Sequence, residues 1–584
     1  MNLWRLCKAL VFFEITSLLI IAQGAFAQNS DPLLVSKTLD RMFQARWSAE
    51  NIRPARLADD AEFFRRIHLD VCGVIPSEEE VMKFLRNKSP QKRLLAIESV
   101  LSSDRFAENW ATVWEKILLG RGQLPRDRAG RIAMNNWLKV RFSENVPYDE
   151  WVYDLITATG ASDEVGAVNF FVKNEFKPEN LAGKTSRIFL GMQIQCTQCH
   201  DDRRTEEWKM EDFWGMAAFF SQTRGRRIRE EGRRNVFLVG DFAKRRQIRE
   251  TLRGELTTVF PKFLDESEEQ RFLSKRRTAL AQWMTSPDNP WFAQEAVNRL
   301  WGHFMGRGLV HPVGDSYDGN PPSHPEVLEV LTNDFREHGF DYKHSMKVIL
   351  NSSTYQRASS SVPTSQKMDP ENRTFFRARL KPLGPEQLFN SILMATNISQ
   401  ELKQRAKNSS SEQARNSILR RFVFVFENDE MQEVTDFEET IPQALMMLND
   451  EVINRGVLAR PKSALLNIAR SKGGLPDKIT RLYLRTLGRI PTSEEKTTLS
   501  QYVMQRIATG SVNIRPSGPS ETAQIARAVV KGDRYDFLRK ITDRSLKRGI
   551  KGQNARSRQA RPVIKALEDV LWALINSSEF IFNH

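Results

Sequence analysis

The chain has 584 residues, of which 40% are hydrophobic, 9% aromatic and 27% charged. These proportions are ordinary for a globular protein and exclude both a wholly disordered chain and a polytopic membrane protein. At about 150 residues per domain, the length favours several domains. The net charge of +15 favours anionic partners such as acidic polysaccharide, lipid headgroups or nucleic acid, without choosing among them.

Residues 1–27 have the three parts of a secretory signal peptide. Two basic residues precede an apolar run over 9–22, and Ala25-Phe26-Ala27 provides a small-x-small cleavage site. An uncleaved anchor is the alternative, but the run is short for a bilayer span and contains Glu14. We therefore expect an exported protein, periplasmic or extracellular, with no membrane span after cleavage.

The first strong helical pattern after this segment ends at a glycine. Four residues share one face of the predicted helix: Phe64, Ile67, His68 and Cys72. Gly73 is a C-terminal stop, and Ser77 with Glu80 predicts a capping box at the start of the next helix. On this face we expect His68 to be a core histidine and Cys72 a buried thiol.

Two of the three cysteines that follow the cleavage site stand in Cys196-Thr197-Gln198-Cys199-His200. Three cysteines are too few for a disulfide framework, and this spacing is the one that attaches c-type haem. Residues three apart share a face of a helical turn, so both thiols can reach the two vinyl groups of one porphyrin. Cys196 and Cys199 are therefore the predicted attachment residues, and His200 the predicted proximal ligand of the haem iron.

Two other interpretations of this motif remain open. In an oxidising compartment the thiols can form a local disulfide, or they can hold zinc together with His200 and a carboxylate of Asp201 or Asp202. A haem iron takes a second axial ligand from Met or His, and six residues are candidates: Met192, Met210, Met216, His303, His311 and His324. Met210 belongs to an apolar helical stripe, which is more typical of a core position.

A basic segment follows, in which residues 224–253 hold eleven Lys or Arg against four acidic residues. Aromatic and β-branched residues predict strands at Asn235–Val239, at Leu256–Phe263 and, much later, at Phe422–Phe426. A polyanion can dock on such a segment, although a solvated surface is the commoner explanation. We expect a small β-containing insert over 224–270, and the chain carries no nucleic-acid-binding motif.

Beyond the insert, a glycine-rich turn precedes another helix start. Ser323 and Glu326 predict a capping box there. Two arginines flank the glycine-rich turn, Arg299 and Arg307. Their guanidinium groups can bind an acidic ligand, but the expected partners are Asp315 and Asp318.

The helix-turn-helix pattern near residue 70 returns 415 residues later. Arg66, Leu69, Gly73, Pro76, Glu79 and Glu80 match Arg481, Leu484, Gly488, Pro491, Glu494 and Glu495. Two copies are too few for a solenoid, so this pattern indicates a duplicated element.

Several long motifs carry a family resemblance. Arg66-Ile67-His68-Leu69-Asp70, the segment 189–201 and Glu211-Asp212-Phe213-Trp214-Gly215 resemble the planctomycete cytochrome-like domain. Val297-Asn298-Arg299-Leu300-Trp301, Gly306-Arg307-Gly308-Leu309-Val310 and the segment 320–326 resemble the partner domain of unknown function that habitually follows it. The resemblance implies a secreted protein that binds haem covalently, with no established reaction. Asp202 stands where that family often has a second histidine.

Together these patterns predict a mainly α, multidomain helical protein with a small β-containing insert. The expected parts are a signal peptide (1–27), a cytochrome-like domain (28–223), the basic insert (224–270), the partner domain (271–460) and a C-terminal helical region carrying the repeat (461–584). The leading hypothesis is haem c and electron transfer to an unidentified redox partner. The alternative is an exported scaffold, or a protein that binds acidic polysaccharide or another polyanion, in which the motif is a disulfide or zinc staple. No hydrolase motif stands out.

Overall fold

The structure is a computed structural model that describes residues 31–120, 128–228, 235–242, 248–252, 255–265, 268–271, 273–398, 457–508 and 561–584. The predicted signal peptide and the predicted strand at Phe422–Phe426 lie outside these residues. The described chain is mainly α-helical with a few short strands, which confirms the predicted fold class. None of its helices combines the length and the apolar character that crossing a bilayer requires.

The helices of the first 220 residues follow the amphipathic segments of the sequence. They are α2 (Pro32–Ala49), α3 (Asp60–Cys72), α4 (Glu78–Arg86), α5 (Lys92–Leu101), α6 (Asp104–Leu119), α7 (Arg128–Ser143), α8 (Tyr148–Thr157), α9 (Asn169–Lys173), α10 (Pro178–Thr185) and α11 (Met210–Phe219). Short helices η2 (Gly166–Val168), η3 (Ser186–Leu190) and η4 (Ile194–Gln198) lie between them. Asp31, Asp59, Ser77 and Ser103 cap α2, α3, α4 and α6, and so satisfy backbone N–H groups at the helix starts.

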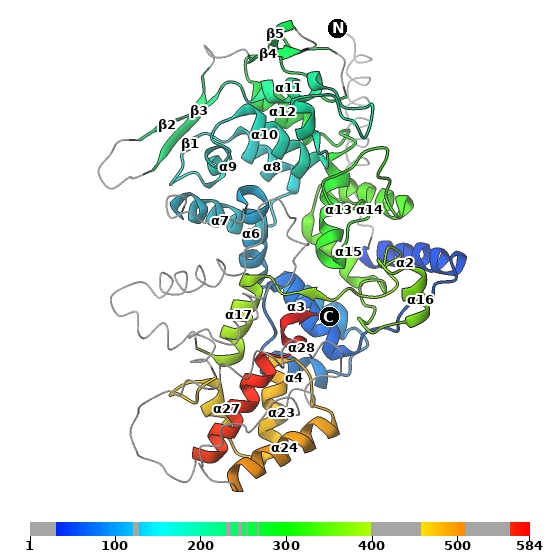
Figure 1. Cartoon of the computed structure of the whole chain (residues 1–584), viewed down its shortest axis with the longest axis vertical. Helices are drawn as coiled ribbons and strands as arrows, with labels where there is room; N and C mark the ends of the chain where they lie inside the picture. The colour runs from blue at the N-terminus through cyan, green and yellow to red at the C-terminus, as the bar shows by residue number, and fades with distance from the viewer. Residues whose placement is uncertain are drawn as a thin grey trace, which may run out of the picture.

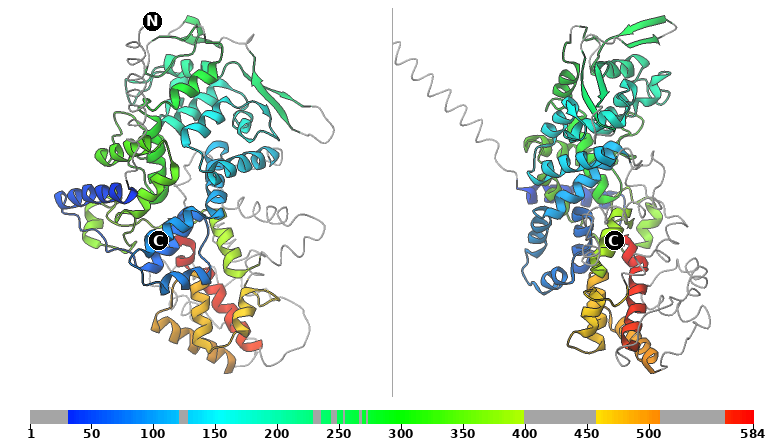
Figure 2. Two further views of the ribbon diagram at one scale, coloured as in Figure 1. Left: turned by 180° about the vertical axis from the view of Figure 1, so that it is seen from behind. Right: turned by 90° about the vertical axis from the view of Figure 1, so that its left-hand side faces the viewer.

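The later helices are α12 (Arg276–Met284), α13 (Phe292–Met305), α14 (Pro325–Glu337), α15 (Tyr342–Asn351), α16 (Pro363–Met368), α17 (Pro385–Thr396), α22 (Ala464–Arg470), α23 (Leu475–Thr486), α24 (Ser493–Ala508), α27 (Arg561–Ile575) and α28 (Ser578–Ile581). Figure 1 shows an elongated molecule, with α8 to α12 at one end and α23, α24 and α27 at the other. In the views of Figure 2, α13 to α15 lie in the middle beside α2.

The strands are short and antiparallel. One sheet has the order β1 (Gly160–Ala161), β3 (Phe237–Asp241), β2 (Thr223–Arg227); β4 (Ile248–Leu252) pairs with β5 (Glu255–Val259), and β6 (Lys381–Pro382) with β7 (Phe582–Asn583). Strands β3 and β5 overlap two of the predicted strands, which confirms a small β insert. The second ends at Val259 rather than at Phe263.

The start of α14 differs from the prediction. Its N-cap is His324, and no side chain caps it. Pro325 takes the first helical position, where its fixed φ angle suits the helix and its missing N–H costs nothing. Ser323 Oγ lies 3.2 Å from Nδ1 of His324 instead. The predicted capping box between Ser323 and Glu326 is therefore wrong, because the proline moves the helix start by one residue.

Two hydrophobic clusters form the core. The larger one is formed by helices from α2 to α15. The smaller one is formed by α17, α22, α23, α24 and α27. Helix α3 contributes to both, because Ile67 and Val71 face the larger cluster and Leu69 faces the smaller one. One N-terminal helix therefore ties the C-terminal region to the rest of the molecule.

The predicted repeat is present as two copies of one helix–turn–helix, α3–α4 and α23–α24. A glycine with left-handed backbone follows the first helix of each copy, with φ +64° at Gly73 and +73° at Gly488. Capping boxes open the second helices at Ser77 and Thr492. The copies contact each other, since a Cβ at Gly488 would lie 3.6 Å from Cβ of Arg65. The duplication is therefore structural as well as sequential.

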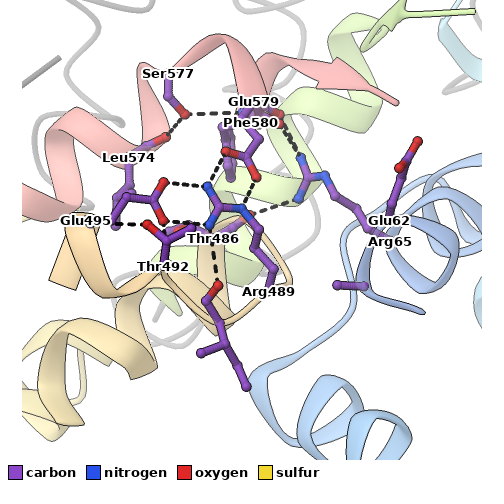
Figure 3. A network of polar contacts seen from close by, with 12 residues as sticks. Glu62, Arg65, Thr486, Arg489, Thr492, Glu495, Leu574, Ser577, Glu579 and Phe580 are labelled. Carbon is purple, nitrogen blue, oxygen red and sulfur yellow. Dashed lines mark hydrogen bonds and ion pairs between the residues drawn. The ribbon is translucent and has the colours of Figure 1, made fainter. Parts of the chain in front are cut away.

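Figure 3 shows how polar groups join the two copies to the C-terminal helices. Arg489 pairs with Glu495 at 2.8 Å and with Glu579 at 2.5 Å. From α3, the guanidinium of Arg65 donates to the carbonyl oxygens of Thr486, at 2.9 Å, and of Glu579, at 3.2 Å. Segments more than 400 residues apart in sequence thus share one network.

A second junction surrounds the buried carboxylate of Asp70. Its Oδ1 accepts hydrogen bonds from Lys381 Nζ at 2.6 Å and from Asn583 Nδ2 at 2.7 Å, and its Oδ2 accepts one from the Tyr355 hydroxyl at 2.9 Å. The pairing of β6 with β7 sets Lys381 opposite Asn583 and so brings both donors to one carboxylate. Burial lowers the pKa of Lys381, and the Asp70 carboxylate opposes that shift.

Candidate functional site

The cysteine motif lies on an irregular segment between α10 and α11 (Figure 1). Helix η3, a turn of π-helix, ends at Gly191, which has φ +75°. A Cβ there would lie 2.8 Å from Oε2 of Glu295 on α13, so the close approach requires glycine. Ile194 and Thr197 are buried, and Thr197 Oγ1 donates to the Ile194 carbonyl at 2.7 Å. These inward contacts leave the residues beside them facing outward.

Both thiols of the motif are exposed and unbridged. Cys196 lies within η4 and Cys199 follows its last residue, with the Cys199 N–H 3.4 Å from the Cys196 carbonyl oxygen. The thiols therefore stand one turn apart on a 3₁₀ helix. Cys72, by contrast, is buried as predicted, and burial raises the pKa of its thiol. The two motif cysteines are the accessible ones of the described part of the chain.

His200 follows the second thiol and is exposed. Its Nδ1 lies 2.7 Å from the backbone carbonyl oxygen of Asp201. Because a carbonyl only accepts, Nδ1 is the donor in this contact, which leaves Nε2 as the ring nitrogen that can face a metal. Metal-binding histidines are usually oriented in this way by a hydrogen bond from the other ring nitrogen.

The carboxylates beside His200 are already engaged. Asp201 Oδ1 accepts from the Met210 N–H at 2.9 Å and so helps to start α11. Asp202 accepts from the Arg204 N–H at 2.8 Å and from its guanidinium at 3.2 Å. Burial alone would raise the pKa of Asp202, but the hydrogen bonds and charge of Arg204 outweigh burial and hold that pKa below its usual value. The position that is often histidine in the resembling family is thus an arginine partner here.

A loop between α13 and α14 closes one side of the site. Arg204 donates to Asp315 Oδ1 at 2.9 Å and lies over the ring of Tyr317 at 4.7 Å from its centroid. The Ser316 N–H donates to the Gly191 carbonyl at 2.7 Å. The sequence prediction missed this contact, because no local pattern relates residue 204 to a loop more than 100 residues away.

The two loop arginines form ion pairs, as expected, but the predicted partners Asp315 and Asp318 are wrong. Arg299 pairs with Glu295 one turn earlier, at 2.6 Å, and both side chains are buried. Arg307 pairs with Glu371 at 3.4 Å. Neither arginine pairs with Asp315, which binds Arg204. The helical i,i+4 geometry within α13 makes the nearer carboxylate the better partner.

Asp318, the other expected partner, faces a carboxyl group instead. Burial and the neighbouring Asp318 carboxyl group together raise the pKa of Glu207. Two acidic side chains therefore lie close together in the same loop contact as Arg204.

The candidates for a second axial ligand fall into two groups. Met192, Met216 and His324 are buried in the core, and His303 directs Nε2 to the Asp70 carbonyl at 3.0 Å. Met210 and His311 are half-buried. Met210 begins α11, and its N–H contacts Asp201, which is next to His200 in the chain. The backbone of Met210 therefore contacts the residue that follows His200.

A metal site needs several donor atoms close together. Within the described ranges, one group of three His, Cys, Asp or Glu side chains brings its ligand atoms within 4.8 Å of one another: Asp334, His338 and His344. The motif cysteines with His200 do not form such a group in this structure. The zinc interpretation of the motif would therefore require the segment to rearrange.

Comparison with known families places two domains on the chain. Residues 38–225 match the model of PSCyt2, described as a protein of unknown function (DUF1549), and residues 276–503 match that of PSD1, described as a protein of unknown function (DUF1553). They stand in the order that the sequence motifs indicated. Neither the curated proteins nor the solved structures gave a match.

The site lies where these two domains meet. The cysteine motif falls within 38–225, and the loop with Asp315 and Tyr317 falls within 276–503. The protein therefore combines two domains of unknown function whose contact includes the exposed cysteine motif.

Proposed function

We propose that this protein is an exported carrier of one covalent c-type haem that takes part in electron transfer. One observation carries the proposal: two exposed, unbridged thiols stand one turn apart beside an exposed imidazole whose Nδ1 is fixed by a backbone carbonyl. Cys196 and Cys199 would form the thioether bonds, and His200 would bind iron through Nε2. The donor set and its exposure fit the group.

The surrounding residues position this motif. Buried Thr197 anchors the turn, and the Trp214 Nε1–H donates to the Gln198 carbonyl at 3.1 Å. The hydrogen bond from His200 Nδ1 sets the orientation of the ring. When bound, the haem supplies one-electron redox chemistry. A site at the surface suits exchange with a separate redox partner.

The test is a visible spectrum, with and without dithionite, of the full chain purified from a host that exports it and attaches haem. We expect a Soret band, sharp bands on reduction and a mass excess of one haem that survives denaturation. A Cys196→Ala, Cys199→Ala variant should lose all three. Cys72→Ala is the matched control, since it removes a cysteine outside the motif and should keep the haem. A folded, colourless protein of unmodified mass would exclude the proposal.

A second candidate is an exported scaffold that binds acidic polysaccharide or another polyanion. It is favoured by strand β2, where Arg226 and Arg227 are both exposed. In this case the cysteines form a disulfide or a zinc staple. Retention of a colourless protein on a sulfated-polysaccharide resin, lost in Arg226→Ser, Arg227→Ser and strongly dependent on salt, would support it.

A further inference from the structure

A compact group of metal-binding side chains lies at the corner between α14 and α15, apart from the cysteine motif. Asp334 and His338 are one turn apart at the end of α14, and His344 is in the first turn of α15. The connecting turn is held in place, because Phe340 is buried with φ +56° and the Asp341 side chain accepts from the His344 N–H at 3.1 Å. Both histidines are therefore presented by ordered backbone.

The side chains converge on the Asp334 carboxylate. His344 Nε2 lies 3.0 Å from Oδ2, and His338 Nδ1 lies 3.3 Å from Oδ1. The imidazole rings are stacked, with centroids 3.7 Å apart and planes 11° apart. Asp334 is 5% exposed, while the histidine side chains are 14% and 11% exposed. The carboxylate is sheltered, and the imidazoles retain access to solvent.

We propose that Asp334, His338 and His344 bind one divalent transition metal of the zinc class. Two imidazoles and a carboxylate are a donor set that zinc accepts, with room for a water as the fourth ligand. Tetrahedral zinc with bonds of about 2.0–2.1 Å places its donors roughly 3.3 Å apart. Here one donor atom from each of the three side chains lies within 4.8 Å of the others, so a small side-chain movement would bring them to that spacing. The spacing of His338 and His344, with five residues between them, also lies within the range of zinc-binding histidine pairs.

The proton balance of binding is simple. In the structure His338 Nδ1 is 2.7 Å from the Asp334 carbonyl oxygen, so this nitrogen carries a proton without metal. Histidine binds a metal as the neutral imidazole, so each ring would present an unprotonated nitrogen to the ion and Asp334 its carboxylate, and any displaced proton would pass to solvent. No oxidant or reductant is needed. The bound ion would join the end of α14 to the start of α15 and open the stack of the rings.

The two cysteines of the motif must be replaced in this test, because their thiols can also bind zinc. We would titrate Zn²⁺ and Co²⁺ into the full chain carrying Cys196→Ser and Cys199→Ser. The expected result is one metal ion per chain, with cobalt d–d bands and no thiolate charge-transfer band. His344→Gln in this background should weaken binding at least about 100-fold, more than the loss of an outer-shell partner usually costs. Glu337→Gln is the matched control, since it removes an exposed acid of the same helical turn and should bind normally.

Two results would overturn the proposal. One is a protein with wild-type circular dichroism that binds neither ion with the cysteines replaced. The other is unchanged cobalt spectra in His344→Gln, which would place the metal elsewhere. If His344→Gln fails to fold, Asp334→Asn replaces it, because this change keeps the side-chain size and removes the charge. The outcome is independent of haem attachment, which these variants do not measure.

Discussion

The two copies of the helix–turn–helix share a left-handed turn glycine and a capping box but have different surroundings. The first, α3–α4, is enclosed: Arg66, His68 and Asp70 are all buried. The second, α23–α24, lies at the end of the molecule, where Arg481 remains 37% exposed and pairs with Glu78 of the first copy. The comparison teaches that one local sequence pattern specifies the turn and the caps. The packing around each copy determines which of its polar groups matter most for stability.

The largest difference in the free energy of unfolding is expected between variants at two equivalent positions, Asp70 and Arg485. Asp70→Ala would leave the half-buried Lys381 ammonium without its carboxylate, and breaking a buried ion pair typically costs about 3–5 kcal/mol. Arg485→Ala removes two partly exposed hydrogen bonds, to the carbonyls of Ala395 and Met394, each worth about 1 kcal/mol. Urea unfolding of the full chain measures both. Equal losses would show that the enclosure of the first copy has no energetic consequence.

At another pair of equivalent positions, His68 and Tyr483, the two copies should differ in how acid affects stability. Burial lowers the pKa of His68 from 6.5 to about 4, so the folded state keeps this ring neutral. The unfolded chain then binds the proton first, and stability that is complete above pH 6.5 is lost as the pH falls toward 4, by at most roughly 3 kcal/mol. His68→Phe should flatten the fall in stability between those pH values. An unchanged slope in this variant would contradict the assignment.

The turn glycines give a matched test of crowding. An alanine costs about 1–2 kcal/mol at either position, because both have left-handed backbone. At Gly73 the new Cβ would also lie 2.1 Å from Oδ1 of Asn109, whose amide donates to the Val71 carbonyl. At Gly488 the nearest atom is 3.6 Å away. Thermal unfolding should therefore show a larger loss for Gly73→Ala than for Gly488→Ala, and the reverse order would be evidence against the packing described.

The smallest loss of stability is expected at the two N-caps, and it should be nearly the same in both copies. Ser77→Ala and Thr492→Ala each remove a side-chain oxygen that accepts from the backbone N–H three residues later, at 3.3 and 3.2 Å. Each should cost about 1 kcal/mol. Hydrogen exchange at the start of α4 and of α24 measures the local effect. A much larger cost at one cap would show that the caps depend on tertiary surroundings after all.

Much of the fold was predictable because its signals are local. Gly73, its counterpart Gly488 and the capping box at Ser77 were predicted from short motifs, and the structure confirms them. The start of α14 was predicted wrongly, because a serine three residues before a glutamate resembles a cap even where Pro325 moves the helix start. Two local signals, the capping serine and the helix-starting proline, predict different start residues for α14, and the folded backbone shows which one applies.

The candidate site was predictable in its motif and not in its surroundings. Cys196 and Cys199 stand out by spacing, and their exposure is new information. The contacts of Arg204 with Asp315 and Tyr317 depend on how two domains meet, which no periodicity encodes. The group of Asp334, His338 and His344 was also missed, because its donors lie on two helices whose corner angle the sequence does not state.

The hydrogen bond between Asp70 and Asn583 has a consequence for the order of folding. It spans 513 residues, so α3 cannot complete its contacts until residue 583 has been synthesised. Contacts of such long range are slow to form, because the entropy of closing the loop must be overcome first. The enclosed copy of the repeat is thus an early segment of the chain that reaches its final state late, and a chaperone would have the longest opportunity to bind there.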